Sequence, residues 1–204
     1  MRCARPQLLA QRENVDLSNS DWALTLDRNA SWEGDKLFVN PQLSTLPVNE
    51  PTGGWSLLAH PDKQRVHLPA TVEGELWDWN GSTYGVTGNY VGVSWWQTKV
   101  NIPASWAGKR IALRFGAVRF RAEVFVNRKL AGYDAVNSTP FEIDITPYVS
   151  LGKSNEISVR ITDPNGNFNW KDSQTYLWGN QVNTPSHGCG GQTGRLSLVA
   201  PPQE

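Results

Sequence analysis

The stretch from Gly92 to Val149, GVSWWQTKVNIPASWAGKRIALRFGAVRFRAEVFVNRKLAGYDAVNSTPFEIDITPYV, decides the fold. Apolar residues recur in it at every second position, in three runs: Ile111, Leu113 and Phe115; Ala122, Val124 and Val126; Phe141, Ile143 and Ile145. Because successive side chains of a strand point to opposite faces of a sheet, a period of two predicts half-buried β-strands. The sequence therefore predicts antiparallel β-structure here.

Turn-forming residues separate these runs. They are Pro103, Gly108, Gly116, Gly132 and the cluster 137–140. Such residues end strands. A tight turn is expected at Asn127 and Arg128, because asparagine tolerates a left-handed backbone. The spacing is that of an antiparallel sandwich.

The same alternation continues outside this stretch. Strands are predicted over 22–26, 66–71, 155–161 and 195–199. Between Ala30 and His60 the period is lost, apart from one short candidate strand at 37–39. A loop of this length is unusual in a compact domain. It is either an insertion packed on the sandwich or the rim of a site, and the sequence leaves both open.

Three phrases resemble the amino-terminal β-sandwich of glycoside hydrolase family 2. They are Gly92 with Trp95-Trp96, the run 124–127 (VFVN), and the run 140–148 (PFEIDITPY). The resemblance implies an all-β antiparallel jelly-roll sandwich with a galactose-binding-domain-like fold. Arg128 stands where the family usually has glycine, so an ordinary type I turn is expected there rather than a primed one.

The resemblance runs from about residue 16 to residue 200 and divides the chain. Residues 1–15 are expected to be a disordered or expression-derived N-terminus. Residues 16–200 form the jelly-roll sandwich, and residues 201–204 are expected to be the stub of a linker toward a further domain.

Composition excludes several classes of function. The 204 residues carry 19 basic and 19 acidic side chains, so no basic stripe is available for nucleic acid. The sequence contains no run of eighteen apolar residues, so no membrane span is predicted. Cys3 and Cys189, like the three histidines, lack the spacing of metal ligands, so we expect no metal and no cofactor.

Ten tryptophans stand out in this composition. Core positions are predicted for Trp22, Trp106 and one of the pair Trp95 and Trp96, which lie in or beside strand patterns. Four others lie in loop-like sequence: Trp77, Trp79, Trp170 and Trp178. An aromatic face in a loop is suited to stack on the C–H face of a sugar.

The irregular segment from Asp163 to Arg195 is the most informative loop. The resemblance implies that it reaches toward a neighbouring catalytic barrel, places an acidic residue against sugar hydroxyls, and returns through a glycine phrase, here 186–195. Asp172 is the matching acidic residue, with Trp170, Trp178 and His187 as further candidate substrate-binding residues. A solvated loop carboxylate at Asp172 and a hydrogen-bonding strut at His187 are the competing interpretations.

No catalytic residue is expected in this chain. The resemblance implies that catalysis is carried out by two glutamates on a TIM barrel. Such a barrel needs about 250 residues, more than the chain has. Signatures of other enzyme classes, such as G-x-S-x-G and H-E-x-x-H, do not occur. The carboxylates Glu123, Glu142 and Asp144 alternate with apolar residues and are predicted to face solvent.

The expected function is a non-catalytic domain that supports the barrel of a β-galactosidase-like or related retaining glycosidase and lends loop residues to its glycan pocket. Its partners would be a carbohydrate and the other domains of the same polypeptide. An independent carbohydrate-binding module and a purely structural sandwich are the alternatives. Relatives that degrade glycans suggest a periplasmic or secreted parent.

Overall fold

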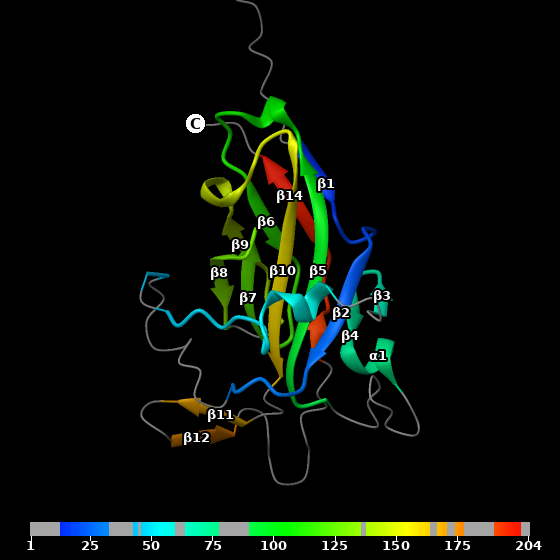
Figure 1. Ribbon diagram of the computed structural model, residues 1–204, viewed down its shortest axis with the longest axis vertical. Helices are drawn as coiled ribbons and strands as arrows, with labels where there is room; N and C mark the ends of the chain where they lie inside the picture. The colour runs from blue at the N-terminus through cyan, green and yellow to red at the C-terminus, as the bar shows by residue number, and fades with distance from the viewer. Residues whose placement is uncertain are drawn as a thin grey trace, which may run out of the picture.

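The computed structural model is an antiparallel β-sandwich, which confirms the predicted fold class (Figure 1). It describes residues 13–32, 43–44, 46–59, 64–77, 90–135, 138–163, 167–170, 174–177 and 190–200. In these residues every strand pairing is antiparallel. The two larger sheets face each other across the core.

The larger sheet has six strands. Their order is β3 (Gln64–Val66), β2 (Trp22–Asp27), β5 (Gly92–Ile102), β10 (Lys153–Asp163), β7 (Arg121–Val126) and β8 (Lys129–Asp134). The long strands β5 and β10 pair along their whole length, from Gly92 opposite Asp163 to Ile102 opposite Lys153. This central pair sets the length of the sandwich.

The opposite sheet has four strands and joins the two ends of the chain. Their order is β1 (Glu13–Asp16), β14 (Leu196–Ala200), β6 (Ala112–Phe115) and β9 (Phe141–Asp144). Strand β1 begins at Glu13, whose carboxylate accepts hydrogen bonds from Trp106 Nε1 and Lys109 Nζ. The ordered sandwich therefore starts before residue 16, the boundary expected from the sequence.

The remaining elements are short. They are α1 (Val72–Leu76), η1 (Trp55–Ala59), η2 (Ala104–Trp106), η3 (Thr146–Tyr148), the pair β4 (Ala70–Thr71) with β13 (Gly191–Gln192), and the hairpin β11 (Asn167–Trp170) with β12 (Gln174–Leu177). The strand predicted over 66–71 is thus two strands, β3 and β4, separated by His67, Leu68 and Pro69. The candidate strand at 37–39 lies outside the described residues.

The main core lies between the two sheets and contains three of the predicted tryptophans. Trp22 and Trp96 are fully buried and Trp106 is 1% exposed. Trp22 Nε1 donates to Leu17 O at 2.9 Å and Trp96 Nε1 to Ser94 Oγ at 3.0 Å, so burial leaves neither indole N–H unpaired. The predicted core positions are confirmed.

A second, smaller core covers the outer face of the six-stranded sheet. Trp95, Phe125, Val93 and Leu58 are buried in it, and Trp55 packs against them. The ring centroid of Trp55 lies 5.7 Å from that of Trp95 and 5.5 Å from that of Phe125, both edge-on. We call residues 46–59 the strap; Figure 1 shows it crossing the sheet in cyan. For these residues, the packed insertion is the correct alternative.

The prediction that Glu123 faces solvent is wrong, because the strap covers this face of the sheet. It is 0% exposed and accepts a hydrogen bond from Asn49 Nδ2 of the strap at 2.7 Å. Glu123 does alternate with apolar residues, but both faces of β7 are buried. Its burial pattern is that of a strand inside a layered protein rather than at a surface.

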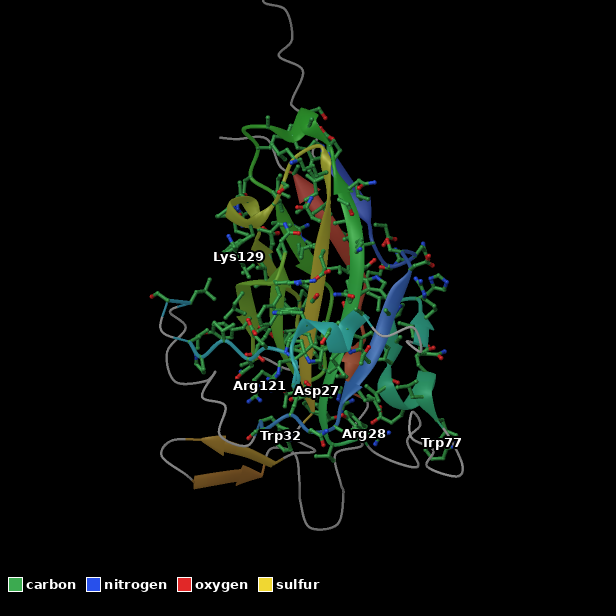
Figure 2. All side chains as sticks on the ribbon, viewed as in Figure 1. Asp27, Arg28, Trp32, Trp77, Arg121 and Lys129 are labelled. Carbon is green, nitrogen blue, oxygen red and sulfur yellow. The ribbon has the colours of Figure 1, made fainter. Side chains whose placement is uncertain are left out.

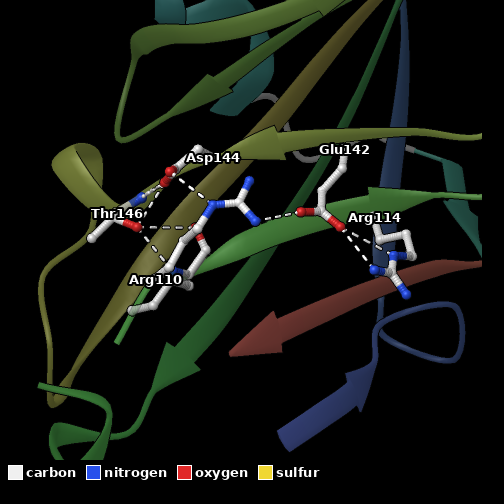
Figure 3. Close-up of polar contacts among 6 residues, drawn as sticks. Arg110, Arg114, Glu142, Asp144 and Thr146 are labelled. Carbon is white, nitrogen blue, oxygen red and sulfur yellow. Dashed lines mark hydrogen bonds and ion pairs between the residues drawn. The ribbon is translucent and has the colours of Figure 1, made fainter. Parts of the chain in front are cut away.

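Glu142 and Asp144, in contrast, lie at the surface of the four-stranded sheet (Figure 3). Arg110 bridges both carboxylates, at 2.7 Å from Glu142 and 3.1 Å from Asp144. Arg114 reaches the other oxygen of Glu142 at 2.9 Å. Partial burial acts to raise the pKa of Glu142, but the hydrogen bonds from Arg110 and Arg114 hold it below its usual value.

The turn between β7 and β8 differs from the prediction. Asn127 and Arg128 have φ values of 50° and 66°, which are the two positive angles of a primed hairpin turn. Asn127 Nδ2 donates to Tyr148 O at 2.9 Å, and its Oδ1 accepts from Glu156 N at 3.0 Å. Arg128 lies 3.6 Å from Glu156 and 5.9 Å from the ring centroid of Trp55. These contacts accompany the unusual backbone of Arg128.

Candidate functional site

Two loop-like segments of the sequence, 78–89 with Trp79 and 164–189 with Asp172, are attached at one end of the sandwich. Strand β5 begins with Gly92 directly opposite Asp163, with which β10 ends, and Asp27 ends β2 beside them. We call this the loop end, defined by Gly92, Asp163 and Asp27. The segments that precede Gly92 and follow Asp163 are therefore attached to neighbouring points of the same sheet.

The other ends of both segments are attached close by. Gly191 pairs with Thr71, and Val72 N–H donates to Gly190 O at 2.8 Å. A Cβ at Gly190 would lie 2.9 Å from Cβ and Oδ2 of Asp163, so no side chain fits between these two residues. The segment 164–189 thus begins and ends at residues in contact.

Helix α1 lies between Thr71, which pairs with Gly191 after the segment 164–189, and Trp77, after which the segment 78–89 begins. Thr71 caps it by accepting from Gly74 N–H at 3.1 Å, and Trp77 follows its last residue. Trp77 is 55% exposed and is the only aromatic residue among the large apolar side chains exposed in the described part of the chain. Of the tryptophans proposed for sugar stacking, it is the one whose exposure the structure describes.

Buried polar groups lie just beneath the loop end. Asp27 is 4% exposed and its Oδ2 accepts from Trp95 Nε1 at 3.2 Å and from Thr52 N–H of the strap at 2.9 Å. Burial raises the pKa of Tyr90; the charges of Asp27 and Asp163 raise it further, and Arg28 opposes them. Tyr90 is therefore a neutral hydrogen-bond donor, and its hydroxyl donates to Val93 O at 2.7 Å.

Figure 2 shows Asp27, Arg28, Trp32 and Arg121 gathered at this end of the sandwich, with Trp77 at its side. Arg121 begins β7 opposite Thr162 of β10 and is 3% exposed. Asp27 and Arg121 are buried, whereas Arg28 is exposed and Trp32 half-buried, so Arg28 and Trp32 are the two that can reach a hydroxyl-rich ligand. No motif in the sequence indicates these four residues, and polar residues such as Asp27 and Arg121 are ordinary at the ends of strands.

The structure gives no geometry for most of the predicted sugar-binding residues. Asp172, Trp178 and His187 lie outside the described residues, as do Trp79 and Cys189. Trp170 ends β11 and its backbone pairs with Gln174 of β12, so it lies on a strand and not in a loop as expected. The alternation of Asn167-Phe168-Asn169-Trp170 is too short to be conclusive in the sequence. The sugar-binding roles stay predictions.

The described residues hold no group of three or more His, Cys, Asp or Glu side chains that is arranged to hold a metal ion. No helix within the described ranges is long and apolar enough to cross a membrane.

Comparison with known proteins agrees with this fold and with the resemblance in the sequence. The family model described as "Glycosyl hydrolases family 2, sugar binding domain" matches residues 82–183, half of the chain. The chain belongs to this family. The matched region contains β5 to β10 and both attachments at Gly92 and Asp163.

Curated relatives are much longer glycosidases. A β-glucuronidase of Formosa agariphila is 26% identical over 53% of this chain and 11% of its own length. A β-glucuronidase of Bacteroides fragilis is 33% identical over 48% of this chain and 14% of its own. A β-galactosidase of Bacteroides ovatus is 26% identical over 78% and 16%. The chain spans less than a fifth of each of these relatives.

Solved structures share the fold along nearly the whole chain. A β-glucuronidase of Lactobacillus rhamnosus has a TM-score of 0.65 and 20% identity, covering 98% of this chain and 30% of its own. One of Ruminococcus gnavus has a TM-score of 0.64 and 18% identity, with the same coverage. At this identity the likeness establishes the sandwich fold alone.

Proposed function

We propose that this chain is the non-catalytic, amino-terminal sandwich domain of a longer glycoside hydrolase. It supports a catalytic domain outside these residues and contributes loop residues to that domain's glycan pocket. The relatives are named as β-glucuronidases and β-galactosidases, so the proposed substrate is a β-glucuronide or β-galactoside. The proposed reaction is retaining hydrolysis, with both catalytic carboxylates supplied by the other domain.

One observation supports this proposal: the segment 164–189, which resembles a glycan-facing loop of the family, and the tryptophan-containing segment 78–89 are both attached at the loop end. Gly92 opposite Asp163 fixes one end of each segment, and α1 with β13 fixes the other. A rigid sheet that anchors two long segments at neighbouring points is a usual way in which a domain positions binding residues. The attachment points therefore favour a shared role for the two segments.

The proposed roles follow the chemistry of each side chain. Asp172 would accept hydrogen bonds from sugar hydroxyls, and His187 would donate or accept one. Trp170 and Trp178 would stack on the apolar face of the sugar ring. These residues bind and orient the sugar; proton transfer and nucleophilic attack belong to the other domain.

The test compares the longer polypeptide with this chain alone, using p-nitrophenyl β-glucuronide and β-galactoside. The chain alone should give no turnover, and Asp172→Asn in the longer polypeptide should weaken kcat/KM by about tenfold or more, the loss typical of one hydrogen bond to a charged group. Turnover by the chain alone, or an Asp172→Asn variant with wild-type kinetics, would contradict the proposal.

Two other functions are distinguished by glycan binding to the chain alone and by the KM of loop variants in the longer polypeptide. An independent carbohydrate-binding module would bind a glycan without the longer polypeptide, with the exposed Trp77 as a candidate contact. A purely structural sandwich would support the fold of its parent while every loop variant kept normal KM. We favour the contributing domain because both segments converge on one end.

A further inference from the structure

Glu73 lies at the junction between the two segments at the loop end. It is the second residue of α1, directly after the Val72 N–H that donates to Gly190 O. Trp77, where the segment 78–89 begins, follows the same helix. A single turn of helix therefore carries the return of one segment and the start of the other.

The Glu73 side chain also binds Tyr90, the residue that follows the segment 78–89. Its Oε1 accepts a hydrogen bond from the backbone N–H of Tyr90 at 2.8 Å. Tyr90 is 7% exposed, and its hydroxyl is anchored to Val93 O at 2.7 Å. The chain thus leaves α1 at Trp77 and is tied back to α1 at Tyr90.

The electrostatic setting of Glu73 is costly for a carboxylate. Its Oε2 is buried with no hydrogen-bond partner among the described residues. Burial raises the pKa of Glu73, while the hydrogen bond from Tyr90 N–H and the charge of Arg119 act to lower it. A partly desolvated carboxylate with one unsatisfied oxygen does not add to stability by itself. Its hydrogen bond with Tyr90 N–H instead fixes the position of Tyr90 relative to α1.

Arg119 ties this junction to the rest of the sandwich. Its backbone N–H donates to Gly191 O at 2.8 Å, and Gly191 pairs with Thr71 at the start of α1. The guanidinium lies 5.0 Å from the ring centroid of Phe120, and its charge acts on Glu73. A displacement of α1 would therefore move the attachment points of both segments, at Gly190 and at Tyr90.

We propose that Glu73 is a positioning residue, whose hydrogen bond to Tyr90 N–H fixes Tyr90, the residue after the segment 78–89, relative to α1 and to Gly190, the residue after the segment 164–189. It does not touch the sugar; it acts through Tyr90 and α1. This inference rests on the proposed function for its effect on glycans, but the hydrogen bond itself is independent of that function.

The first arm of the test measures hydrogen exchange of the Tyr90 amide in this chain. Glu73→Ala should speed it by about ten- to hundredfold, the range for losing a hydrogen bond to a charged group. Glu73→Gln keeps an oxygen acceptor and should restore protection to within about threefold of the wild-type chain. Glu75→Ala, which removes an acidic residue from the same helix, is the control and should leave it unchanged.

The second arm measures KM of the longer polypeptide for the aryl glycosides. Glu73→Ala should raise KM by about tenfold, because a misplaced binding segment weakens the substrate complex. Glu73→Gln and Glu75→Ala should keep KM near that of the wild type. A general loss of stability would instead lower the active fraction, and hence kcat, without changing KM.

The outcomes separate the two proposals. Unchanged Tyr90 exchange in Glu73→Ala, or no rescue by Glu73→Gln, overturns the positioning role of Glu73. Faster exchange with unchanged KM also overturns it, because the contact then has no effect on the pocket. A longer wild-type polypeptide with no glycosidase activity refutes the proposed function instead, and this is visible before any variant is made.

Discussion

The guanidinium of Arg160 lies 2.5 Å from the carboxylate of Glu123, and the two side chains are only 2% and 1% exposed. Arg160 Nη1 also donates to Thr162 Oγ1 at 3.1 Å, and Asn49 of the strap donates to the other oxygen of Glu123. The pair lies on the outer face of the six-stranded sheet, where the strap covers it. It joins a strand pair to the strap through buried charges.

We predict that Glu123→Ala destabilises the chain by about 3–5 kcal/mol, because it leaves the Arg160 charge buried without its partner. Replacing both, as Glu123→Leu with Arg160→Met, should cost much less than Glu123→Ala alone, since neither charge then remains. Urea unfolding followed by tryptophan fluorescence gives both values. A single variant within about 1 kcal/mol of wild type would contradict the role of the pair.

The strap should depend on Trp55. Trp55→Ala removes the edge-on contacts with Trp95 and Phe125, and we expect a loss of about 2–3 kcal/mol for this partly buried ring. Ser56→Ala is the matched control, because Ser56 is exposed on the same turn and should change stability by less than about 0.5 kcal/mol. Equal unfolding midpoints for the two variants would show that the strap is not packed as described.

The primed turn at Asn127 and Arg128 predicts a dependence on residue type. At φ 66°, Arg128→Val places a β-branched side chain in a left-handed backbone and should destabilise by about 1–3 kcal/mol. Arg128→Gly relieves the backbone but loses the contacts with Glu156 and Trp55, so its net effect should stay within about 1 kcal/mol. Thermal unfolding measures the stability of both variants. Equal stability of Arg128→Val and Arg128→Gly would contradict the left-handed backbone at residue 128.

The surface network of Figure 3 predicts a pH dependence. The folded-state pKa values of Glu142 and Asp144 are lowered: partial burial opposes this, but hydrogen bonds outweigh it, from Arg110 and Arg114 to Glu142 and from Thr146 and Arg110 to Asp144. Their stabilising contribution is therefore present above the ordinary carboxylate pKa of about 4 and lost as the pH falls through the lowered values.

Between pH 6 and pH 2 the unfolding free energy should fall less in Arg110→Ala than in the wild type. In the wild type, 1 M NaCl should also make this fall smaller, because the ion pairs are partly exposed and salt screens them. Lys99→Ala removes an exposed cation from another sheet and serves as the control. If Arg110→Ala and Lys99→Ala give the same pH dependence as the wild type, the network does not determine it.

The strands were predictable because alternation is local. Ile111 to Ile145 and Ile157 to Ile161 show the period of two in the sequence itself, and the tryptophan core follows from it. The strap was not predictable, because residues 46–59 have no period and their packing depends on Trp95 and Phe125, which come much later in the chain. Glu123 was misassigned for the same reason, since alternation distinguishes two faces without saying what covers each.

The position of the candidate site was only partly predictable. Loop composition and family resemblance selected the segments around 78–89 and 164–189, but only the pairing of Gly92 with Asp163 shows that they leave one end together. Glu73 gave no sequence signal, because a glutamate in a short helix is an ordinary surface residue. Its role depends on a contact with Tyr90 that no local pattern specifies.

The most direct measurement is isothermal titration of this chain alone with a panel of monosaccharides and oligosaccharides that includes glucuronides and galactosides. If the glycan pocket is completed by a second domain, the wild-type chain should give no binding heat with any of them. Binding at micromolar to low-millimolar strength that Trp178→Ala abolishes would contradict the account and identify the chain as a self-sufficient carbohydrate-binding module.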